Sequence, residues 1–303
     1  HIVRSMLLLT GATGLVGSTL LRRLLAEGAP VRCLVRDPRR LGAQRVRVQI
    51  ALGDLTDPPS FRNALRGVQT VVHLAASIRD QPHGSIEELN GIATWRMVEA
   101  AERQGVERFV FFSALGAATH HRARCMRAKA LAEQAVRESS LSSTVFAPSI
   151  VYAPGDPWLT LLERLSLLPV MPISGRGRAL FQPIWAEDVA DCIVAALRGP
   201  ADEPSTTAGH VRYELAGPET LSHSDIVRTV LRSLGRSRPL VRIPAPMVSR
   251  GLRLLERAMG PSAPATWDEA ELMEASMTSS RGAADAEGFG VQPQRMAAVL
   301  GSG

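Results

Sequence analysis

The stretch LLLTGATGLVGSTLL, Leu7–Leu21, decides the fold. An apolar run leads directly into three glycines, Gly11, Gly14 and Gly17, and an amphipathic segment follows them. Such a turn between a strand and a helix lets backbone N–H groups approach a pyrophosphate at the positive end of the helix dipole. Because the turn opens the first strand–helix unit, a glycine turn without a ligand is the less favoured interpretation. The residues expected to hold a dinucleotide here are Gly11, Thr13, Gly14, Leu15, Val16 and Gly17.

Strands and helices alternate through the first half of the chain. Helices are predicted over Leu15–Glu27 and Ser85–Gln104, each closed by a glycine, and over the shorter Pro58–Leu65. This rhythm predicts an α/β fold with a doubly wound parallel sheet covered on both faces. The expected strands are Met6–Leu9, Val31–Val35, Val46–Leu52, Thr70–Leu74, Arg108–Phe112 and Ser143–Phe146.

After Pro148 the pattern changes to a smaller, mostly helical region. A loop broken by Pro and Gly leads to a helix predicted over Leu159–Leu168, then a strand over Ala179–Pro183. A helix over Ala186–Leu197 and a strand over Arg212–Leu215 follow. We therefore expect a dinucleotide-binding domain over 1–150 and a substrate lobe over 151–303, with segments around 184–216 returning to the first domain.

Composition limits the partners. The formal charge is +6, but only RDPRR (36–40) and GRGR (175–178) are basic clusters, and no aromatic stacking motif accompanies them. We expect no nucleic-acid partner. No apolar run is long enough to span a membrane, so no membrane partner is expected either. The three cysteines lack metal-site spacing, which predicts no metal and a reducing, cytoplasmic setting.

The ribose end of the expected dinucleotide site is basic. Where an acidic residue would accept the ribose hydroxyls of NADH, this chain has Arg36, followed by Asp37 and by Arg39 and Arg40. A guanidinium can bind a 2′-phosphate bidentately, so NADPH is favoured, with NADH as the alternative if Asp37 binds the ribose. Further expected cofactor contacts come from GDLTD and HLAAS, and they are Asp54, Leu55, Ala75 and Ala76.

The stretch CMRAKALAE, Cys125–Glu133, contains Lys129, the only lysine among 35 basic residues. With TGATGLVG, GDLTD, HLAA, VFFSALGA and APSIVYAPGD, it resembles the short-chain dehydrogenase/reductases of the extended and atypical type. The second-half motifs FQPIWAEDVA and YELAGPETLS are similar to the branch that contains the nucleotide-binding accessory subunit of respiratory complex I. The resemblance implies a Rossmann domain with a partly helical C-terminal substrate lobe.

In that superfamily a Ser, a Tyr and a Lys four residues after the Tyr carry the chemistry. Ser113 and Lys129 match, whereas the tyrosine position is Cys125. The resemblance implies that Lys129 and Pro148 contact the cofactor and that Ser113 contacts the substrate oxygen. Trp158, Phe181 and Trp185 are expected to line an apolar substrate pocket.

The missing tyrosine leaves the proton donor open. Cys125 is one candidate, because a nearby Lys⁺ is expected to lower the pKa of a thiol. His120 and His121 are others. A third route is a phenolic hydroxyl on the substrate, and here the chain resembles the Tyr-less ketoreductases of aromatic polyketide antibiotic biosynthesis. These expectations describe an NAD(P)H-dependent ketoreductase acting on a bulky aromatic ketone. The alternatives are a non-catalytic NAD(P)H-binding sensor or assembly subunit and, more weakly, a nucleotide-sugar epimerase.

Overall fold

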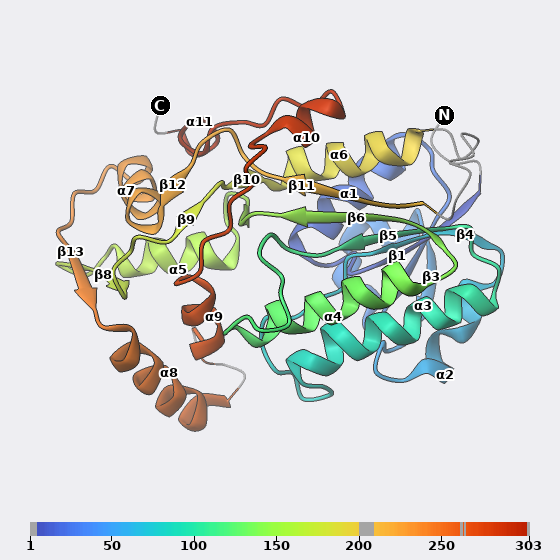
Figure 1. Ribbon diagram of the computed structural model, residues 1–303, viewed down its shortest axis with the longest axis horizontal. Coiled ribbons are helices and arrows are strands. Elements are labelled where there is room, and N and C mark those ends of the chain that lie inside the picture. Colours follow the sequence, from blue (N-terminus) through green and yellow to red (C-terminus); the bar gives the residue numbers. More distant parts are fainter. Residues whose placement is uncertain (1–4, 200–208, 261–262, 264, 302–303) are drawn as a thin grey trace.

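Figure 1 shows the computed structural model, which describes residues 5–199, 209–260, 263 and 265–301. Within these residues seven parallel strands form the main sheet, in the order β11-β6-β5-β4-β1-β2-β3. This order reverses beside β1, as in doubly wound nucleotide-binding folds. The predicted α/β class with a Rossmann-type sheet is confirmed. The strands are β1 (Met6–Thr10), β2 (Val31–Val35), β3 (Gln49–Leu52), β4 (Val68–His73), β5 (Arg108–Phe112), β6 (Ser142–Pro148) and β11 (His210–Leu215).

Helices cover both faces of the sheet (Figure 1). On one face α1 (Leu15–Ala26) packs against α6 (Ala186–Arg198), and the side chains of Leu20, Leu24 and Ile193 are fully buried there. On the other face lie α3 (Ala93–Arg103) and α4 (Arg124–Glu138), with the short α2 (Pro58–Phe61) and the 3-10 turn η2 (Arg62–Leu65) nearby. Because both faces are buried, the central strands are apolar along their length rather than alternating.

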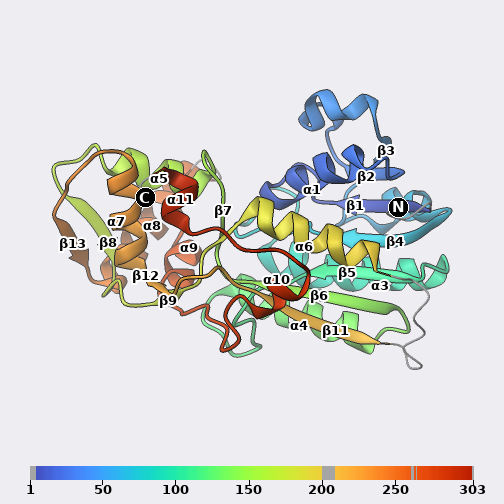
Figure 2. The same cartoon turned by 90° about the horizontal axis from the view of Figure 1, so that it is seen from above.

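The second half of the chain contributes to both parts of the molecule. Strand β11 continues the sheet beside β6, and α6 lies on α1, so residues 186–198 and 210–215 belong spatially with the first half. Most of the remaining elements form a lobe beside the carboxyl edge of the sheet, clearly separated in the view of Figure 2. Its longer helices are α5 (Pro157–Leu165), α7 (His223–Ser233), α8 (Ala245–Met259) and α9 (Trp267–Leu272).

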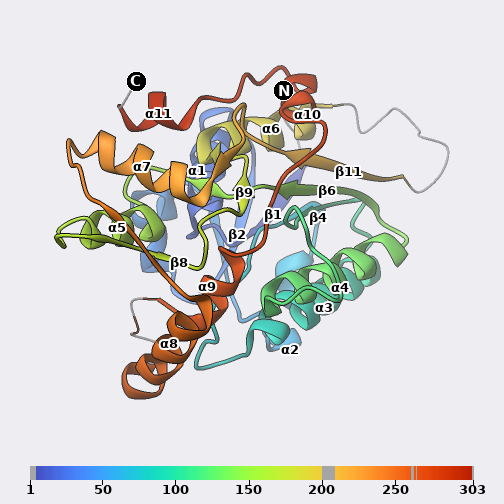
Figure 3. The ribbon, with the colours of Figure 1, turned by 60° about the vertical axis from the view of Figure 1, so that its left-hand side comes forward.

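Short strand pairs hold the lobe together. Strand β13 (Leu240–Ile243) pairs with β8 (Met171–Ser174), and β12 (Leu221–Ser222) pairs with β9 (Leu180–Phe181). Strand β10 (Ile184–Trp185) pairs with β7 (Val151–Tyr152) at the junction. The chain then returns over the sheet through α10 (Ala284–Gly288) and ends in the lobe with α11 (Met296–Leu300), as Figure 3 shows.

Several predicted elements have different bounds, and in two of them the difference has a local structural basis. The strand expected from Val46 begins at Gln49, because η1 (Pro38–Val46) forms 3-10 turns on either side of Gly42, whose φ is 58°. The helix expected over Ser85–Gln104 contains a π-helical segment, η3 (Glu88–Ile92), before α3. There the Asn90 side chain donates to the Ile86 carbonyl at 2.7 Å, which supports this wider turn. No helix within the described ranges is both long and apolar enough to cross a membrane.

Candidate functional site

The glycine turn lies where the order of the sheet reverses, between β1 and β4. Gly11 has φ 74°, and a Cβ atom there would lie 2.6 Å from the backbone nitrogen of Ala75. A Cβ at Gly17 would lie 2.0 Å from the Gly11 carbonyl oxygen. Only glycine fits either position, so the turn, α1 and the end of β4 approach each other at backbone distance. This is the cradle that a pyrophosphate needs.

A cleft of about 790 Å³ opens over this turn. Its wall is built by the ends of β1, β2, β3 and β4 and by the loop that follows β4. The cleft brings together the predicted cofactor residues Gly11, Thr13, Gly14, Arg36, Asp54, Leu55, Ala75 and Ala76. The other predicted cofactor residues, namely Leu15, Val16, Gly17, Lys129 and Pro148, are outside its lining.

One end of the cleft is basic. Arg36 and Arg40 are exposed and line it together with Asp37. The Asp37 carboxylate accepts the backbone N–H and the Nε of Arg39, both at 3.0 Å, and the hydrogen bonds from Arg39 lower the pKa of Asp37. The Asp37 carboxylate is therefore paired with Arg39. The guanidinium groups of Arg36 and Arg40 are the cations that line this end of the cleft.

Asp54 lines the same cleft and lies within electrostatic reach of Arg36. Its Oδ1 accepts the backbone N–H and the hydroxyl of Thr56, both at 2.9 Å. Burial acts to raise the pKa of Asp54, but these bonds and the charges of Arg36 and His83 together lower it. The carboxylate is thus ionised and fixed in orientation, as an acceptor of ligand N–H or O–H groups must be.

The loop after β4 was only partly foreseen from the sequence. Ser77, Gln81, Pro82 and His83 line the cleft in addition to Ala75 and Ala76. Asn90 fixes the start of this loop, because its side chain accepts the Ser77 N–H at 3.1 Å and donates to the Ser77 carbonyl at 2.6 Å. Loop residues of this kind carry no periodic signal, so the sequence alone gives no reason to select them.

His73 is fully buried inside β4. Its ring nitrogens contact the hydroxyl of Thr10 at 2.8 Å and that of Thr94 at 3.1 Å. Burial, assisted by the charge of Lys129, lowers the pKa of His73 to about 3. The imidazole is neutral and satisfied, and it has no ligand-binding role in this arrangement.

Lys129 and Ser113 meet at the carboxyl end of β5. The Lys129 ammonium donates to the Phe112 carbonyl at 2.8 Å and lies 5.8 Å from the centroid of the Phe111 ring. Burial lowers the pKa of Lys129 to about 8. Ser113 is 2% exposed, and its hydroxyl donates to the Glu133 carboxylate, so it does not face the cleft.

Glu133 joins this site without having been selected from the sequence. It lies four residues after Lys129 on α4, and its other oxygen accepts Nε of Arg212 from β11 at 3.3 Å. The spacing of Lys129 and Glu133 along the helix was the available signal. Glu133 accepts the hydrogen bond of the Ser113 hydroxyl, which the resemblance instead expects to bind a substrate oxygen.

Cys125 requires a correction. Its thiol is 4% exposed, and burial raises the pKa, with the charge of Lys129 only partly opposing this effect. The expectation of a thiol with a lowered pKa is therefore wrong. Of the two histidines, His120 is exposed, whereas His121 accepts the Ala123 N–H at 3.0 Å and has a pKa lowered by burial.

The expected substrate residues lie in the lobe, away from the dinucleotide cleft. Phe181 is fully buried and packs with Tyr152 and Leu162 in one hydrophobic cluster, while Trp158 and Trp185 are partly buried against it. Phe181 thus has no surface to offer a substrate in this conformation. Among the residues that the structure describes, no group of three or more His, Cys, Asp or Glu side chains could hold a metal ion.

Comparisons with known proteins agree with this geometry. A family model described as NAD(P)H-binding matches residues 11–200. The mitochondrial NADH dehydrogenase (ubiquinone) 1 alpha subcomplex subunit 9 of Arabidopsis thaliana is 28% identical over 248 residues, which are 78% of this chain and 60% of that protein. The ceramide reductase of Caulobacter vibrioides is 28% identical over 245 residues, which are 80% of this chain and 75% of that protein.

The fold has solved counterparts as well. An NADPH-dependent quinone oxidoreductase from Escherichia coli, crystallised with NADPH, superposes with a TM-score of 0.74 at 17% identity and covers 98% of this chain and 99% of that chain. At that identity the likeness concerns the fold alone. The two glycine positions that exclude a side chain and the cleft above them fit a dinucleotide, in agreement with the matched family.

Proposed function

The chain belongs to the NAD(P)H-binding family, and from this premise we propose that it is an NADPH-dependent ketoreductase acting on a bulky aromatic ketone. The cofactor part of the proposal rests on the cleft. The glycine turn lines it, and Arg36 and Arg40 lie at one end. Two exposed guanidinium groups are suited to the 2′-phosphate that distinguishes NADPH from NADH. The cytoplasm is the proposed location, because all three cysteines are free and buried.

The reductase half of the proposal is supported by relatives and by Lys129. One relative is named as a ceramide reductase, which is an oxidoreductase. Bound NADPH would supply the hydride in such a reaction. Lys129, whose ammonium is held at the end of β5, is the residue that we propose to contact the reacting end of the cofactor. We propose that a substrate hydroxyl supplies the proton, because the buried Cys125 thiol with its raised pKa is a poor acid.

The missing tyrosine gives the chain its resemblance to the Tyr-less ketoreductase of simocyclinone biosynthesis, and for this reason we propose a hydroxylated aromatic polyketide as the substrate. The competing function is a non-catalytic NAD(P)H-binding subunit. Two observations favour it: Ser113 is engaged by Glu133, and one relative is named as a complex I subunit.

The deciding experiment combines binding with turnover. NADPH and NADH are titrated by nucleotide fluorescence, and NADPH oxidation is then followed with a panel of quinone-type polyketides that carry or lack a hydroxyl beside the ketone. We expect tighter NADPH binding and turnover only of the hydroxylated members. Tight NADPH binding without turnover of any aromatic ketone would support the binding subunit, and a Cys125→Ser variant without activity would refute substrate-assisted protonation.

A further inference from the structure

The loop between β4 and η3, residues 77–87, has two neighbours: the cleft on one side and the lobe on the other. Ser77, Gln81, Pro82 and His83 line the cleft. The intervening residues Arg79 and Asp80 instead contact the lobe and α4. Among the residues that the structure describes, none beyond Leu89 lines the cleft, so this loop is a part of the cleft wall that also contacts the lobe.

Arg79 binds the lobe through a planar two-point contact. Its Nε donates to Oε1 of Glu269 at 2.6 Å and one terminal nitrogen donates to Oε2 at 3.0 Å. The other terminal nitrogen donates to the Ala263 carbonyl at 2.7 Å. The side chains of Arg79 and Glu269 are 30% and 20% exposed. A bidentate, partly desolvated pair of this kind fixes orientation, which a solvated single contact does not.

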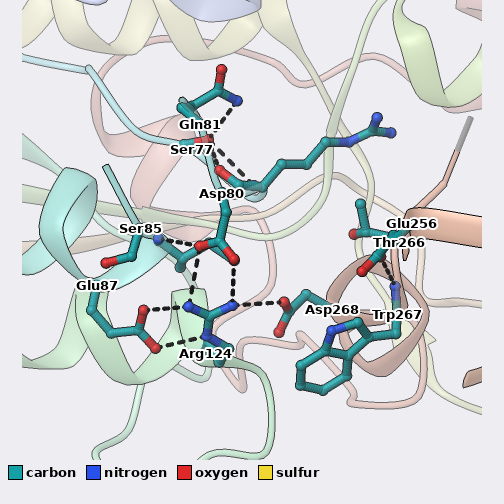
Figure 4. A network of polar contacts seen from close by, with 12 residues as sticks. Ser77, Asp80, Gln81, Ser85, Glu87, Arg124, Glu256, Thr266, Trp267 and Asp268 are labelled. Atoms are coloured by element: carbon teal, nitrogen blue, oxygen red, sulfur yellow. Dashed lines mark hydrogen bonds and ion pairs between the residues drawn. The ribbon is translucent and has the colours of Figure 1, made fainter. Parts of the chain in front are cut away.

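Arg124, the first residue of α4, forms a second link (Figure 4). It contacts both oxygens of Asp80, at 2.9 and 3.1 Å, and both oxygens of Glu87, at 2.8 and 2.6 Å. It also lies 3.4 Å from Oδ2 of Asp268 on α9, whose side chain is 6% exposed. Thus one guanidinium at the start of α4 joins Asp80 and Glu87 of the loop to Asp268 of the lobe.

We infer that Arg79 and Arg124 are positioning residues that couple dinucleotide binding in the cleft to docking of α9 on the domain that carries the sheet. A dinucleotide bound in the cleft orders the loop, and this fixes Arg79 and Asp80 on the other side of the loop. The loop contacts on which α9 docks are then already positioned. Because coupling between two equilibria is reciprocal, docking of α9 also tightens cofactor binding. The inference rests on the proposed dinucleotide site but not on the proposed ketone substrate.

The test is hydrogen–deuterium exchange of the full chain with and without saturating NADPH. In the wild type, NADPH is expected to protect the glycine turn, the loop and α9. Glu269→Gln removes the charge partner of Arg79 with little change in shape, and Arg124→Lys keeps the charge but loses the fork. In both variants protection of the glycine turn persists while protection of α9 is lost, and NADPH affinity falls by about 5-fold or more. A matched control is Arg228→Lys, which alters the exposed Arg228–Asp225 pair on α7 and should leave both signals unchanged.

The outcomes separate the two proposals. If NADPH protects the glycine turn but never α9, the coupling is refuted and the cofactor site stands. If NADPH protects α9 in both variants as it does in the wild type, the coupling does not pass through these residues and the inference is refuted. If NADPH protects neither region, the proposed cofactor site fails together with the coupling. An Arg79→Gln/Glu269→Gln double variant should lose no more than an Arg79→Gln single variant, because the Arg79 substitution already breaks the contact with Glu269.

Discussion

Gly17 lies in the first turn of α1, and its position leaves no room for a side chain. A Cβ there would overlap the Gly11 carbonyl oxygen, 2.0 Å away, and the nearest atoms are backbone, which cannot rotate aside. Gly17→Ala is therefore expected to displace the glycine turn and to weaken NADPH binding by ~10-fold or more, a cost of at least about 1.4 kcal/mol. Fluorescence titration measures this. Gly251→Ala is the control, because Gly251 is helical with open space around it; equal affinities for both variants would contradict the close approach.

Arg36 gives the prediction for cofactor preference. It faces the cleft end that is proposed for the 2′-phosphate, which only NADPH carries. Arg36→Ala should weaken NADPH binding by ~10-fold and leave NADH binding nearly unchanged, because a charge-assisted hydrogen bond contributes about 1.5–3 kcal/mol. Parallel titrations of both nucleotides supply the ratio. Arg39→Ala is the matched control, since its guanidinium is engaged by Asp37. Equal losses for both nucleotides would refute the assignment.

Lys129 makes stability depend on pH. Burial lowers its pKa from 10.5 to about 8 in the folded protein, so the folded state binds fewer protons than the unfolded state between these values. The contribution of Lys129 to the free energy of unfolding therefore rises with pH between its folded and unfolded pKa values, by up to about 1.4 kcal/mol for each pH unit. The free energy of unfolding of wild type minus Lys129→Met should increase from pH 7 to pH 10 in urea denaturation. Parallel pH curves for the two proteins would show that the ammonium is not desolvated.

Sequence reasoning at this scale rests on motifs in which backbone chemistry restricts the residue type. Gly11, Gly14, Asp54, Ala75 and Ala76 were selected because motif and context agree, and the cleft contains them. The predicted lowering of the Cys125 pKa is wrong, because the sequence shows the nearby lysine but not the burial that raises this pKa. The hydrogen-bond partner of Ser113 could not be predicted from the sequence either, because a hydroxyl can rotate toward any acceptor and the sequence does not rank the acceptors around it.

Among the elements, the π-helical segment η3 has the clearest structural role. Asn90 within it is 2% exposed and holds both backbone groups of Ser77 at the start of the cleft loop. Asn90→Ala leaves those groups without their partner, which should reduce the free energy of unfolding by about 1–3 kcal/mol. Chemical denaturation provides the value. Gln134→Ala on the exposed face of α4 is the control and should change stability by less than about 0.5 kcal/mol; a similar small change for Asn90→Ala would contradict the role of η3.

Element types were easier to predict than their ends. Every strand predicted in the first half exists, because apolar runs of four to seven residues that alternate with helical segments have few alternatives. The start of β3 was misplaced because Gly42 permits a backbone conformation, φ 58°, that lets Pro38–Val46 coil into 3-10 turns first. Short strands of the lobe such as β8 and β13 went unrecognised, since four residues give too little pattern to separate a strand from a loop.

For the whole molecule, the alternation of strands and helices was enough to predict the sheet, and the resemblance extended that to a lobe. The contacts between the two parts were not predictable. Arg79 and Glu269 are separated by 190 positions, and nothing in an arginine-rich chain marks which guanidinium meets which carboxylate. Such pairs are fixed only once the fold has brought the loop and α9 together. The proposed coupling is therefore a property of the tertiary structure.

Strand β11 has a consequence for biosynthesis. It pairs with β6 along six residues, His210–Leu215, and therefore completes the sheet from far down the chain. A nascent chain that has left the ribosome only as far as residue 199 presents β6 as an open edge, with its backbone groups available to another polypeptide. The sheet therefore cannot be completed until β11 has emerged, and chaperone protection of that edge would matter most in the interval before then.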